Sequence, residues 1–283
     1  IDIANPKGKI PSGKKIIHAN HDVRNQFGTL LAKHGIQVVY HLAYVVKPSR
    51  DRSWARSINV EGTSSLLRAC SEAGIDKVVY PSSATVYGAR KGNNRHFTEQ
   101  DYPNPLGGFQ YSLDKIASEN LLVKWQNERS KERITTILRS SVVMGIAANN
   151  FIIQALRMNL LPLPAFQDSE LQLLHVSDFA DVLDNALVNE KTGVYNVAGS
   201  GTVSWKQMVR LFGNRYIPIP GPLLQFFTNA SWLLGLQSHS PGQGVNFVRY
   251  PWLVSTEKIK RELGWVPIYT SKQALIAAMG SSK

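Results

Sequence analysis

Tyr111 and Lys115 stand four residues apart in the stretch YSLDK, so on a helix their side chains share one face about one turn apart. A free tyrosine has a pKa of about 10 and is a poor base at neutral pH. A nearby ammonium favours the phenolate and lowers that pKa. A hydroxyl such as that of Ser83 could hydrogen-bond a substrate oxygen beside the tyrosine. Such a trio can remove a proton from an alcohol while a hydride leaves the same carbon.

The spacing alone does not decide for catalysis. A second Tyr-x-x-x-Lys, from Tyr87 to Lys91, contains Gly88 in turn-like surroundings and is interpreted as a loop. The Tyr111 pair follows the turn-rich YPNPLGG, where a helix is expected to begin. The alternative interpretation is an amphipathic helix with one tyrosine against the core.

Strand-like and helix-like segments alternate along the first 200 residues. Several of the strands are continuously apolar, as expected for parallel strands covered on both faces. The pattern predicts an α/β fold, a Rossmann-type doubly wound parallel sheet with a smaller, irregular C-terminal region after residue 200. The predicted strands are 14–19, 36–43, 77–83, 134–141 and 193–199, and the predicted helices are 22–34, 52–73, 111–130, 149–159 and 177–189.

The composition is that of a globular protein, with 43% hydrophobic and 18% charged residues among 283. A single cysteine, Cys70, excludes an internal disulfide and fits a reducing compartment, so we expect a cytoplasmic protein. No apolar run reaches the ~20 residues of a membrane span; the nearest, 221–236, is interrupted by polar residues. The formal charge of +12 could indicate nucleic acid, but the basic residues are scattered. A basic enzyme that binds anionic cofactors is the interpretation we favour.

Eight motifs through nearly the whole chain resemble, in order, those of the extended short-chain dehydrogenases/reductases of the NAD-dependent epimerase/dehydratase type. They are HDVRN 21–25, VVYHLA 38–43, NVEGTSSLLRAC 59–70, VVYPSSATVYG 78–88, YSLDK 111–115, LHVSDFADVL 174–183, VYNVAGSG 194–201 and STEKIKRELGWVP 255–267. The resemblance implies an NAD-dependent oxidoreductase that acts on a small molecule as a homodimer.

The same resemblance assigns residue roles. It implies that Tyr111 is the catalytic base, that Lys115 lowers its pKa and holds the nicotinamide ribose, and that Ser83 is the catalytic hydroxyl, with Ser82 as a supporting neighbour. Asn59 matches a position that shapes the cofactor site. The resemblance also implies further cofactor contacts and a substrate contact beside Ser83; these are Asp22, Val23, Leu42, Ala43 and Tyr44 for the cofactor and Thr85 for the substrate.

The family's glycine-rich turn, which holds the cofactor pyrophosphate at a helix N-terminus, has no match here. Gly8 and Gly13 have the wrong spacing, and the glycines of 198–205 come too late. Asp2 matches the acidic residue that holds the adenosine ribose, which favours NAD over NADP because it would repel a 2′-phosphate; an ordinary N-terminal aspartate is the alternative. We therefore expect that the first β–α unit, about 30 residues, is missing from this sequence, since its strand would lie centrally, between those ending near Asp2 and His41.

Three positions that grip a substrate diphosphate in sugar-nucleotide members are apolar here, namely Val142, Leu171 and Val245. Burying a diphosphate without partners is costly. Arg139 and Arg249 remain as candidate anion ligands in the substrate site, although Arg139 could be structural. We therefore expect a dehydrogenase or reductase acting on a sterol, flavonol or isoprenoid-type carbonyl, with a nucleotide-sugar 4-epimerase or dehydratase as the alternative.

The cofactor domain is predicted to comprise 1–140 and 173–200, and the substrate-binding domain 141–172 and 201–283.

No metal is expected, because His18 and His21 have no further ligand at a suitable spacing. The segment from His175 to Asp178 is interpreted as a helix N-cap, made by Ser177 or Asp178. Besides the dehydrogenase or reductase and the epimerase or dehydratase, a third possible function is that of a degenerate, non-catalytic family member that binds RNA or a protein partner.

Overall fold

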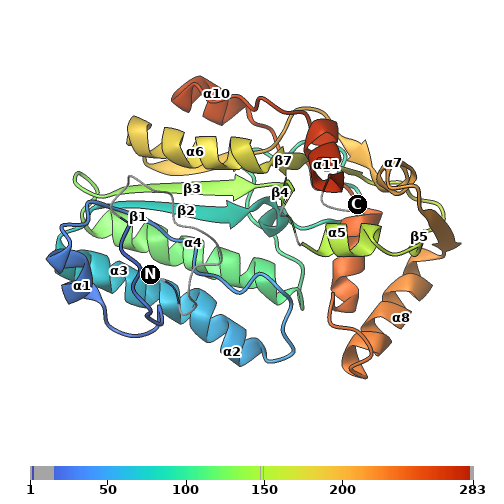
Figure 1. Cartoon of the computed structure of the whole chain (residues 1–283), viewed down its shortest axis with the longest axis horizontal. Helices are drawn as coiled ribbons and strands as arrows, with labels where there is room; N and C mark the ends of the chain where they lie inside the picture. The colour runs from blue at the N-terminus through green and yellow to red at the C-terminus, as the bar shows by residue number, and fades with distance from the viewer. Residues whose placement is uncertain (1, 3–15, 147, 149, 281–283) are drawn as a thin grey trace.

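The computed structural model describes residues 2, 16–146, 148 and 150–280. Its centre is a parallel sheet in the order β1–β2–β3–β8 (Figure 1). The strands are β1 (Val38–Tyr40), β2 (Lys77–Ser83), β3 (Ile134–Ser140) and β8 (Gly193–Val197). In the register, Ser83 lies opposite Ser140 and Lys77 opposite Ile134. The predicted parallel α/β sheet is confirmed.

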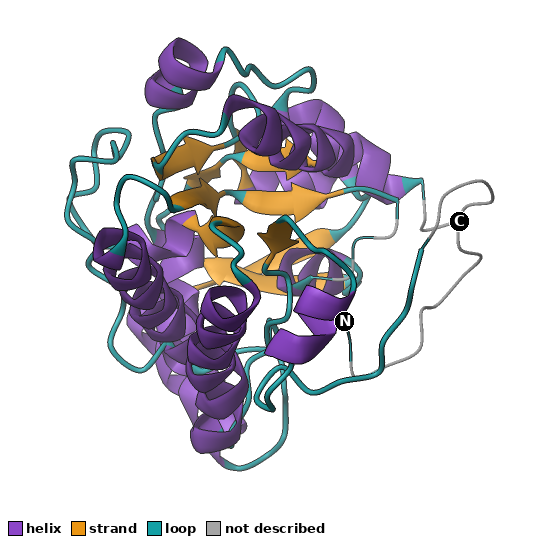
Figure 2. Ribbon diagram, turned by 90° about the vertical axis from the view of Figure 1, so that its left-hand side faces the viewer, coloured by secondary structure: helices purple, strands orange, loops and turns teal. Residues whose placement is uncertain are grey.

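Helices cover both faces of this sheet (Figures 1 and 2). One face carries α1 (Gly28–Lys33), α2 (Arg52–Arg56), α3 (Gly62–Ala73) and α4 (Gln110–Glu128), and the other carries α6 (Val176–Asn189) and α10 (Glu257–Leu263). Neighbouring residues of β2 show the alternation: Tyr80 packs with Cys70 and Leu122 on the first face, whereas Val79 packs with Val182 on the second. Because both faces are buried, consecutive residues such as Val78, Val79 and Tyr80 are apolar, without the alternation of a strand that has one solvated face.

The chain before β1 differs from the prediction. Residues 14 and 15 of the first predicted strand lie outside the described residues, and 16–19 form no strand; Asp2 instead makes a single parallel bridge with Asn20. Of the predicted helix 22–34, only α1 is helical. A turn in which the carboxylate of Asp22 accepts the Arg24 backbone N–H at 2.9 Å occupies the earlier positions, a local bond that competes with helix formation.

The C-terminal part contains three two-stranded sheets and more helices than predicted. The pairs are β4 (Val142–Met144) with β7 (Leu173–His175), β5 (Leu160–Pro164) with β10 (Arg215–Ile219), and β6 (Glu170–Leu171) with β9 (Val203–Ser204). The helices are α5 (Phe151–Leu156), α7 (Trp205–Leu211), α8 (Gly221–Leu233), α9 (Asn246–Arg249) and α11 (Ser271–Met279). Thus β7, from the predicted cofactor domain, pairs with β4, from the predicted substrate-binding domain.

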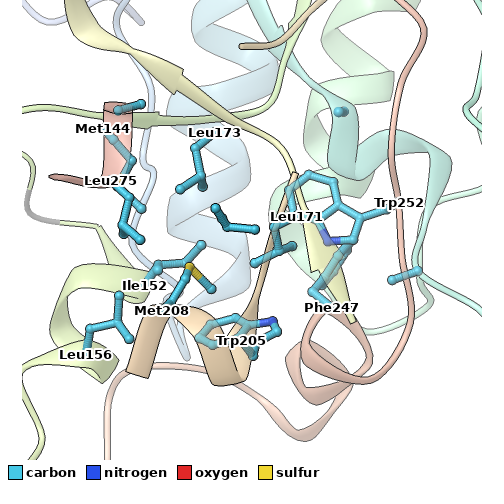
Figure 3. Close-up of a cluster of buried hydrophobic side chains, with 14 of the residues drawn as sticks. Met144, Ile152, Leu156, Leu171, Leu173, Trp205, Met208, Phe247, Trp252 and Leu275 are labelled. Carbon is cyan, nitrogen blue, oxygen red and sulfur yellow. The ribbon is translucent and has the colours of Figure 1, made fainter. Parts of the chain in front are cut away.

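This part has its own apolar core (Figure 3). Ile152 of α5, Leu171 of β6, Met208 of α7 and Leu275 of α11 meet in it, and each is almost fully buried. In the described part of the chain, no helix is long and apolar enough to cross a membrane.

Candidate active site

The carboxyl end of β2 places the first hydroxyl of the site. Ser83 is the last residue of the strand, in extended conformation, and it caps the short 3₁₀ helix η2 (Ala84–Tyr87). The Ser83 Oγ accepts hydrogen bonds from the backbone N–H of Thr85 at 3.3 Å and from its hydroxyl at 3.0 Å. Both residues are buried. Thr85 therefore orients Ser83.

The N-terminal turn of α4 brings Tyr111 to the same place. The hydroxyl of Ser83 lies beside that of Tyr111, near enough to affect its ionisation. Burial raises the pKa of Tyr111 to about 12, and the neighbouring Ser83 hydroxyl opposes that rise. The two residues predicted to share one substrate oxygen are thus neighbours.

Lys115 lies one turn further along α4. Its Nζ donates to the backbone oxygen of Pro81 at 2.7 Å, and it lies 3.7 Å from the centre of the Tyr44 ring and 5.8 Å from that of Tyr111. Burial lowers the pKa of Lys115 to about 7, an effect that the carboxylate of Glu119 opposes. The ammonium therefore faces π-electrons and one carbonyl, and no carboxylate ion pair with it occurs among the described side chains.

A buried polar network lies behind these residues. The Glu119 carboxylate accepts hydrogen bonds from the Ser82 hydroxyl and from Arg139, the latter at 2.7 Å. Arg139 also donates to the Tyr87 hydroxyl at 2.9 Å, and Tyr87 donates to Asn196 at 2.8 Å. Ser82 thus supports the end of β2, while the contacts of Arg139 favour its structural alternative over an anion-binding role.

Asn59 lies in a π-helical turn, η1 (Ser57–Glu61), between α2 and α3. The segment 52–73 was predicted as one helix, and such inserted turns are frequent at functional sites. The Asn59 Oδ1 accepts the backbone N–H of Val45 at 2.7 Å, and its Nδ2 donates to Asp114 at 3.1 Å. The buried Asp114 carboxylate also accepts from Gln110 at 2.7 Å. Asn59 therefore fixes the loop after β1 against α4.

That loop carries Leu42, Ala43 and Tyr44. The Leu42 side chain is exposed, whereas Ala43 and Tyr44 are half-buried. The Tyr44 hydroxyl lies 3.4 Å from the backbone oxygen of Tyr111, and the two rings meet edge to face at 5.7 Å. Four segments therefore bring predicted site residues to the start of α4. These residues are Ser83, Thr85, Tyr111, Lys115, Asn59 and Tyr44.

The other predicted cofactor contacts form a second group. The backbone oxygen of Asp2 accepts the N–H of His21 at 3.0 Å, so Asp2 and Asp22 lie close together. Asp22 forms an ion pair with Arg24 at 2.6 Å, and these bonds lower the pKa of the Asp22 carboxyl to about 2. Val23 is buried in the core, where only its backbone could contact a ligand.

The residues present fit the nicotinamide–ribose end of NAD. Lys115 uses one of its three N–H donors on Pro81, which leaves two for hydroxyl oxygens, and the exposed Leu42 offers an apolar surface. The pyrophosphate end is different, because the printed sequence contains no glycine-rich strand-to-helix turn. The chemistry of the described residues is therefore compatible with the nicotinamide–ribose end of the cofactor.

A pocket adjoins Tyr111, between the loop after β1 and the C-terminal part. Its walls include Phe109 and Trp232, and its rim carries Lys47 and Arg52. Sequence reasoning missed these two cations. The signal was available in VVKPSRDR, since residues that follow the carboxyl end of a parallel strand face the ligand crevice.

The remaining substrate positions lie in the C-terminal part. Leu171 and Val245 are buried, Leu171 in the apolar core of Figure 3, and Val142 is half-buried on β4. The Arg249 guanidinium contacts the side-chain oxygens of Gln167 at 3.2 Å and Gln225 at 3.4 Å. Neutral partners leave its charge uncompensated within the described residues.

The cap of α6 differs from the prediction. His175, and neither Ser177 nor Asp178, is the N-cap residue: its Nδ1 accepts the Ser177 N–H at 3.2 Å. The Asp178 carboxylate accepts the backbone N–H groups of Ile268 and Tyr269, each at 3.0 Å. The prediction was wrong because a distant loop uses the Asp178 carboxylate. No cluster of three potential metal ligands occurs in the described parts of the chain.

Comparison with known proteins points to one family. The model of the NAD dependent epimerase/dehydratase family matches residues 3–198. A protein of unknown function from Mycobacterium bovis is 26% identical over 260 residues, which cover 89% of this chain and 68% of that protein. A 4-epimerase of Escherichia coli O157:H7 that acts on N-acetylglucosaminyl-diphospho-undecaprenol is 32% identical over 129 residues, covering 44% of this chain and 36% of that enzyme.

Solved structures of low sequence identity share the fold. The enzyme MoeE5 in complex with UDP-glucuronic acid and NAD superposes with a TM-score of 0.75 at 22% identity, covering 97% of this chain and 88% of that one. The UDP-glucose 4-epimerase of Thermotoga maritima with UDP-glucose gives a TM-score of 0.71 at 18% identity, covering 93% of this chain and 83% of that one.

Proposed function

Since the chain belongs to the NAD dependent epimerase/dehydratase family, we propose that Tyr111, Lys115 and Ser83 assist hydride transfer at a secondary alcohol or ketone in its active site. The observation that carries this proposal is the position of the Ser83 hydroxyl, at the end of β2, next to the hydroxyl of Tyr111, with the buried ammonium of Lys115 one turn further along α4. A merely structural tyrosine would not need a hydroxyl partner at the end of the strand that leads into the ligand crevice.

The residues divide the work during oxidation of an alcohol. The Ser83 hydroxyl positions the substrate oxygen, and the Tyr111 phenolate accepts the proton from that oxygen. NAD, when bound, supplies the acceptor for the hydride that leaves the same carbon. Tyr111 has a pKa of about 12 in the ligand-free protein, so it needs a nearby positive charge to act near neutral pH. Lys115 supplies that charge and retains two donors for ribose hydroxyls.

The pocket favours a substrate with an apolar body. Phe109 and Trp232 provide aromatic walls, and the buried Leu171 and Val245 offer no partner to a diphosphate. We therefore propose a dehydrogenase or reductase acting on a hydrophobic alcohol or ketone.

A nucleotide-sugar or lipid-diphosphate-sugar epimerase is the second candidate. The observation in its favour is the pair of cations at the rim of the pocket, Lys47 and Arg52, which could bind a diphosphate. The partial likeness to the 4-epimerase of E. coli O157:H7 agrees with it.

The decisive variant is Tyr111→Phe, which removes the proton acceptor and keeps the ring. We expect turnover of a substrate found by screening to fall by about 10²- to 10⁴-fold, with NAD affinity nearly unchanged. Tyr102→Phe, at a tyrosine that is 93% exposed, is the matched control. Normal activity in Tyr111→Phe would refute the proposed role.

The substrate class is decided by thermal shift. In the presence of NAD, UDP-glucose should add little stabilisation if the pocket takes an apolar substrate. A large shift that disappears in Lys47→Gln and Arg52→Gln would favour the epimerase instead.

A further inference from the structure

The outward face of α8 is apolar and uncovered in the described structure. Leu223, Phe226, Phe227 and Leu233 are exposed by 50%, 65%, 59% and 73%. Their spacings of three, four and seven residues place them on one side of the helix, and Leu224 and Trp232 are buried on the other side. Leu234 and Leu236, exposed by 74% and 77%, extend this face beyond the helix. Contiguous exposed apolar patches mark interaction sites.

The chain around this face carries only one sign of charge. Residues 191–256 contain no Asp or Glu, but they contain two lysines and three arginines. The stretch 221–238, which includes the whole of α8, contains no charged residue at all. An apolar helix face within a long acid-free segment differs from an ordinary solvated surface helix, which carries charges of both signs.

Two arginines contact α8 near its ends. Arg249 reaches Gln225 at 3.4 Å. Arg50 donates to the backbone oxygen of Trp232 at 3.0 Å and stacks over its ring at 4.8 Å. Among the described residues, neither arginine forms a salt bridge with a carboxylate. The loop that carries Arg50 also exposes Lys47 and the apolar Val46.

We propose that α8 docks on the surface of an anionic phospholipid bilayer, with Phe226, Phe227 and Leu233 in the interface and with the net positive charge of the chain attracting it to the lipid phosphates. The helix has 13 residues, too few to span a bilayer of about 30 Å, so it lies in the plane of the surface. An amphipathic helix with bulky apolar side chains and adjacent cations has the properties of an interfacial anchor.

Charge favours a lipid surface over a second copy of the chain. Two copies that met through α8 would bring two copies of the acid-free segment 191–256 together, and each chain carries a formal charge of +12. An anionic surface attracts the same surroundings. The pocket adds a functional reason, because Trp232 of α8 and Lys47 both line it; docking would place the pocket beside the bilayer. The docking itself does not depend on the proposed reaction.

The test is sedimentation of the purified protein with vesicles of phosphatidylcholine mixed with phosphatidylglycerol. We expect binding to the mixed vesicles that weakens with salt, and weaker binding to phosphatidylcholine alone. The double variant Phe226→Ser/Phe227→Ser should lower the partition coefficient by about tenfold or more. The matched control is Val188→Ser/Ile268→Ser, at apolar side chains that are 79% and 76% exposed outside α8.

Two outcomes would overturn the proposal. One is failure of the native protein to bind the mixed vesicles. The other is equal binding by the α8 double variant and the control double variant, both verified as folded by their melting temperatures. Analytical ultracentrifugation tests the alternative, in which a second copy of the chain covers this face. A native protein that is dimeric and does not bind vesicles, together with a monomeric α8 double variant, would show that alternative.

Discussion

The ammonium of Lys115 lies 3.7 Å from the centre of the Tyr44 ring, closer than it lies to the ring of Tyr111, the proposed base. Tyr44 follows β1 and Lys115 belongs to α4, so this cation–π contact joins the two segments that border the proposed cofactor site. Tyr44 therefore helps to hold the ammonium in place.

Replacing Tyr44 separates the effect of the ring from that of the hydroxyl. Cation–π contacts contribute about 0.5–2 kcal/mol, so Tyr44→Leu should weaken NAD binding by about tenfold because the Lys115 ammonium loses its support. Tyr44→Phe keeps the ring and should bind NAD almost normally. Isothermal titration calorimetry measures both constants. Similar affinities for the Leu and Phe variants would contradict the orienting role.

The pKa of Lys115 predicts how stability depends on pH. Burial lowers this pKa from 10.5 to about 7. Between these values the unfolded chain binds more protons than the folded one, so the free energy of unfolding rises with pH by at most about 1.4 kcal/mol per pH unit from this group. The part of the free energy of unfolding that depends on the ionisation of Lys115 is fully present above pH 10.5 and is lost as the pH falls towards 7.

Lys115→Met removes that dependence. The free energies of unfolding of the native protein and the variant are measured in urea at about pH 7 and about pH 9. The difference between them, native minus variant, should increase as the pH rises. Tyr111 does not interfere, since its pKa is raised and it titrates only above this range. A stability difference that stayed constant would mean that Lys115 is not buried as described.

The buried ion pair between Glu119 and Arg139 makes a second stability prediction. Their side chains are only 4% and 6% exposed, and removing one partner of such a pair typically costs about 3–5 kcal/mol. Glu119→Gln should therefore lower the free energy of unfolding by several kcal/mol. The control is Glu72→Gln, because Glu72 pairs with Arg68 on the surface, where about 0–1 kcal/mol is expected. Equal effects in urea unfolding would refute the prediction.

Gly62 makes a prediction about packing. A Cβ at this position would lie 2.7 Å from the Val23 Cγ1, so Gly62→Ala should overpack the core and cost about 1–3 kcal/mol. At Gly107 an added Cβ meets nothing within 4 Å, and Gly107→Ala should be nearly neutral. Differential scanning calorimetry compares the two. A Gly62→Ala protein as stable as the control would show that Val23 can move aside.

The sequence predicted the sheet, and the structure brings Ser83, Tyr111 and Lys115 close together, for a physical reason. Strands buried on both faces contain runs of consecutive apolar residues, which made β2 and β3 recognisable, and the spacing of Tyr111 and Lys115 depends only on helical geometry. The proximity of Ser83 and Tyr111 followed from motif order, because both segments meet at the same end of the sheet.

Other features depend on contacts between distant segments. Nothing near Arg139 in the sequence indicates that Glu119 binds it, and nothing near Asp178 indicates the backbone of Ile268. Helix α8 was recognised only as an apolar segment, because its two faces are both apolar and only the fold decides which one is buried. The assignment of Asp2, Asp22 and Val23 to the cofactor remains a prediction.

The network of Ser82, Glu119 and Arg139 has an entropic consequence for the reaction. Ser82 adjoins Ser83 in β2, and Glu119 lies one turn beyond Lys115 in α4, so one buried carboxylate ties together the strand and the helix that carry the reactive groups. Side-chain freedom at these positions is lost when the chain folds, and little remains to be lost when a ligand arrives. Such preorganisation leaves more of the binding energy available for stabilising the transition state.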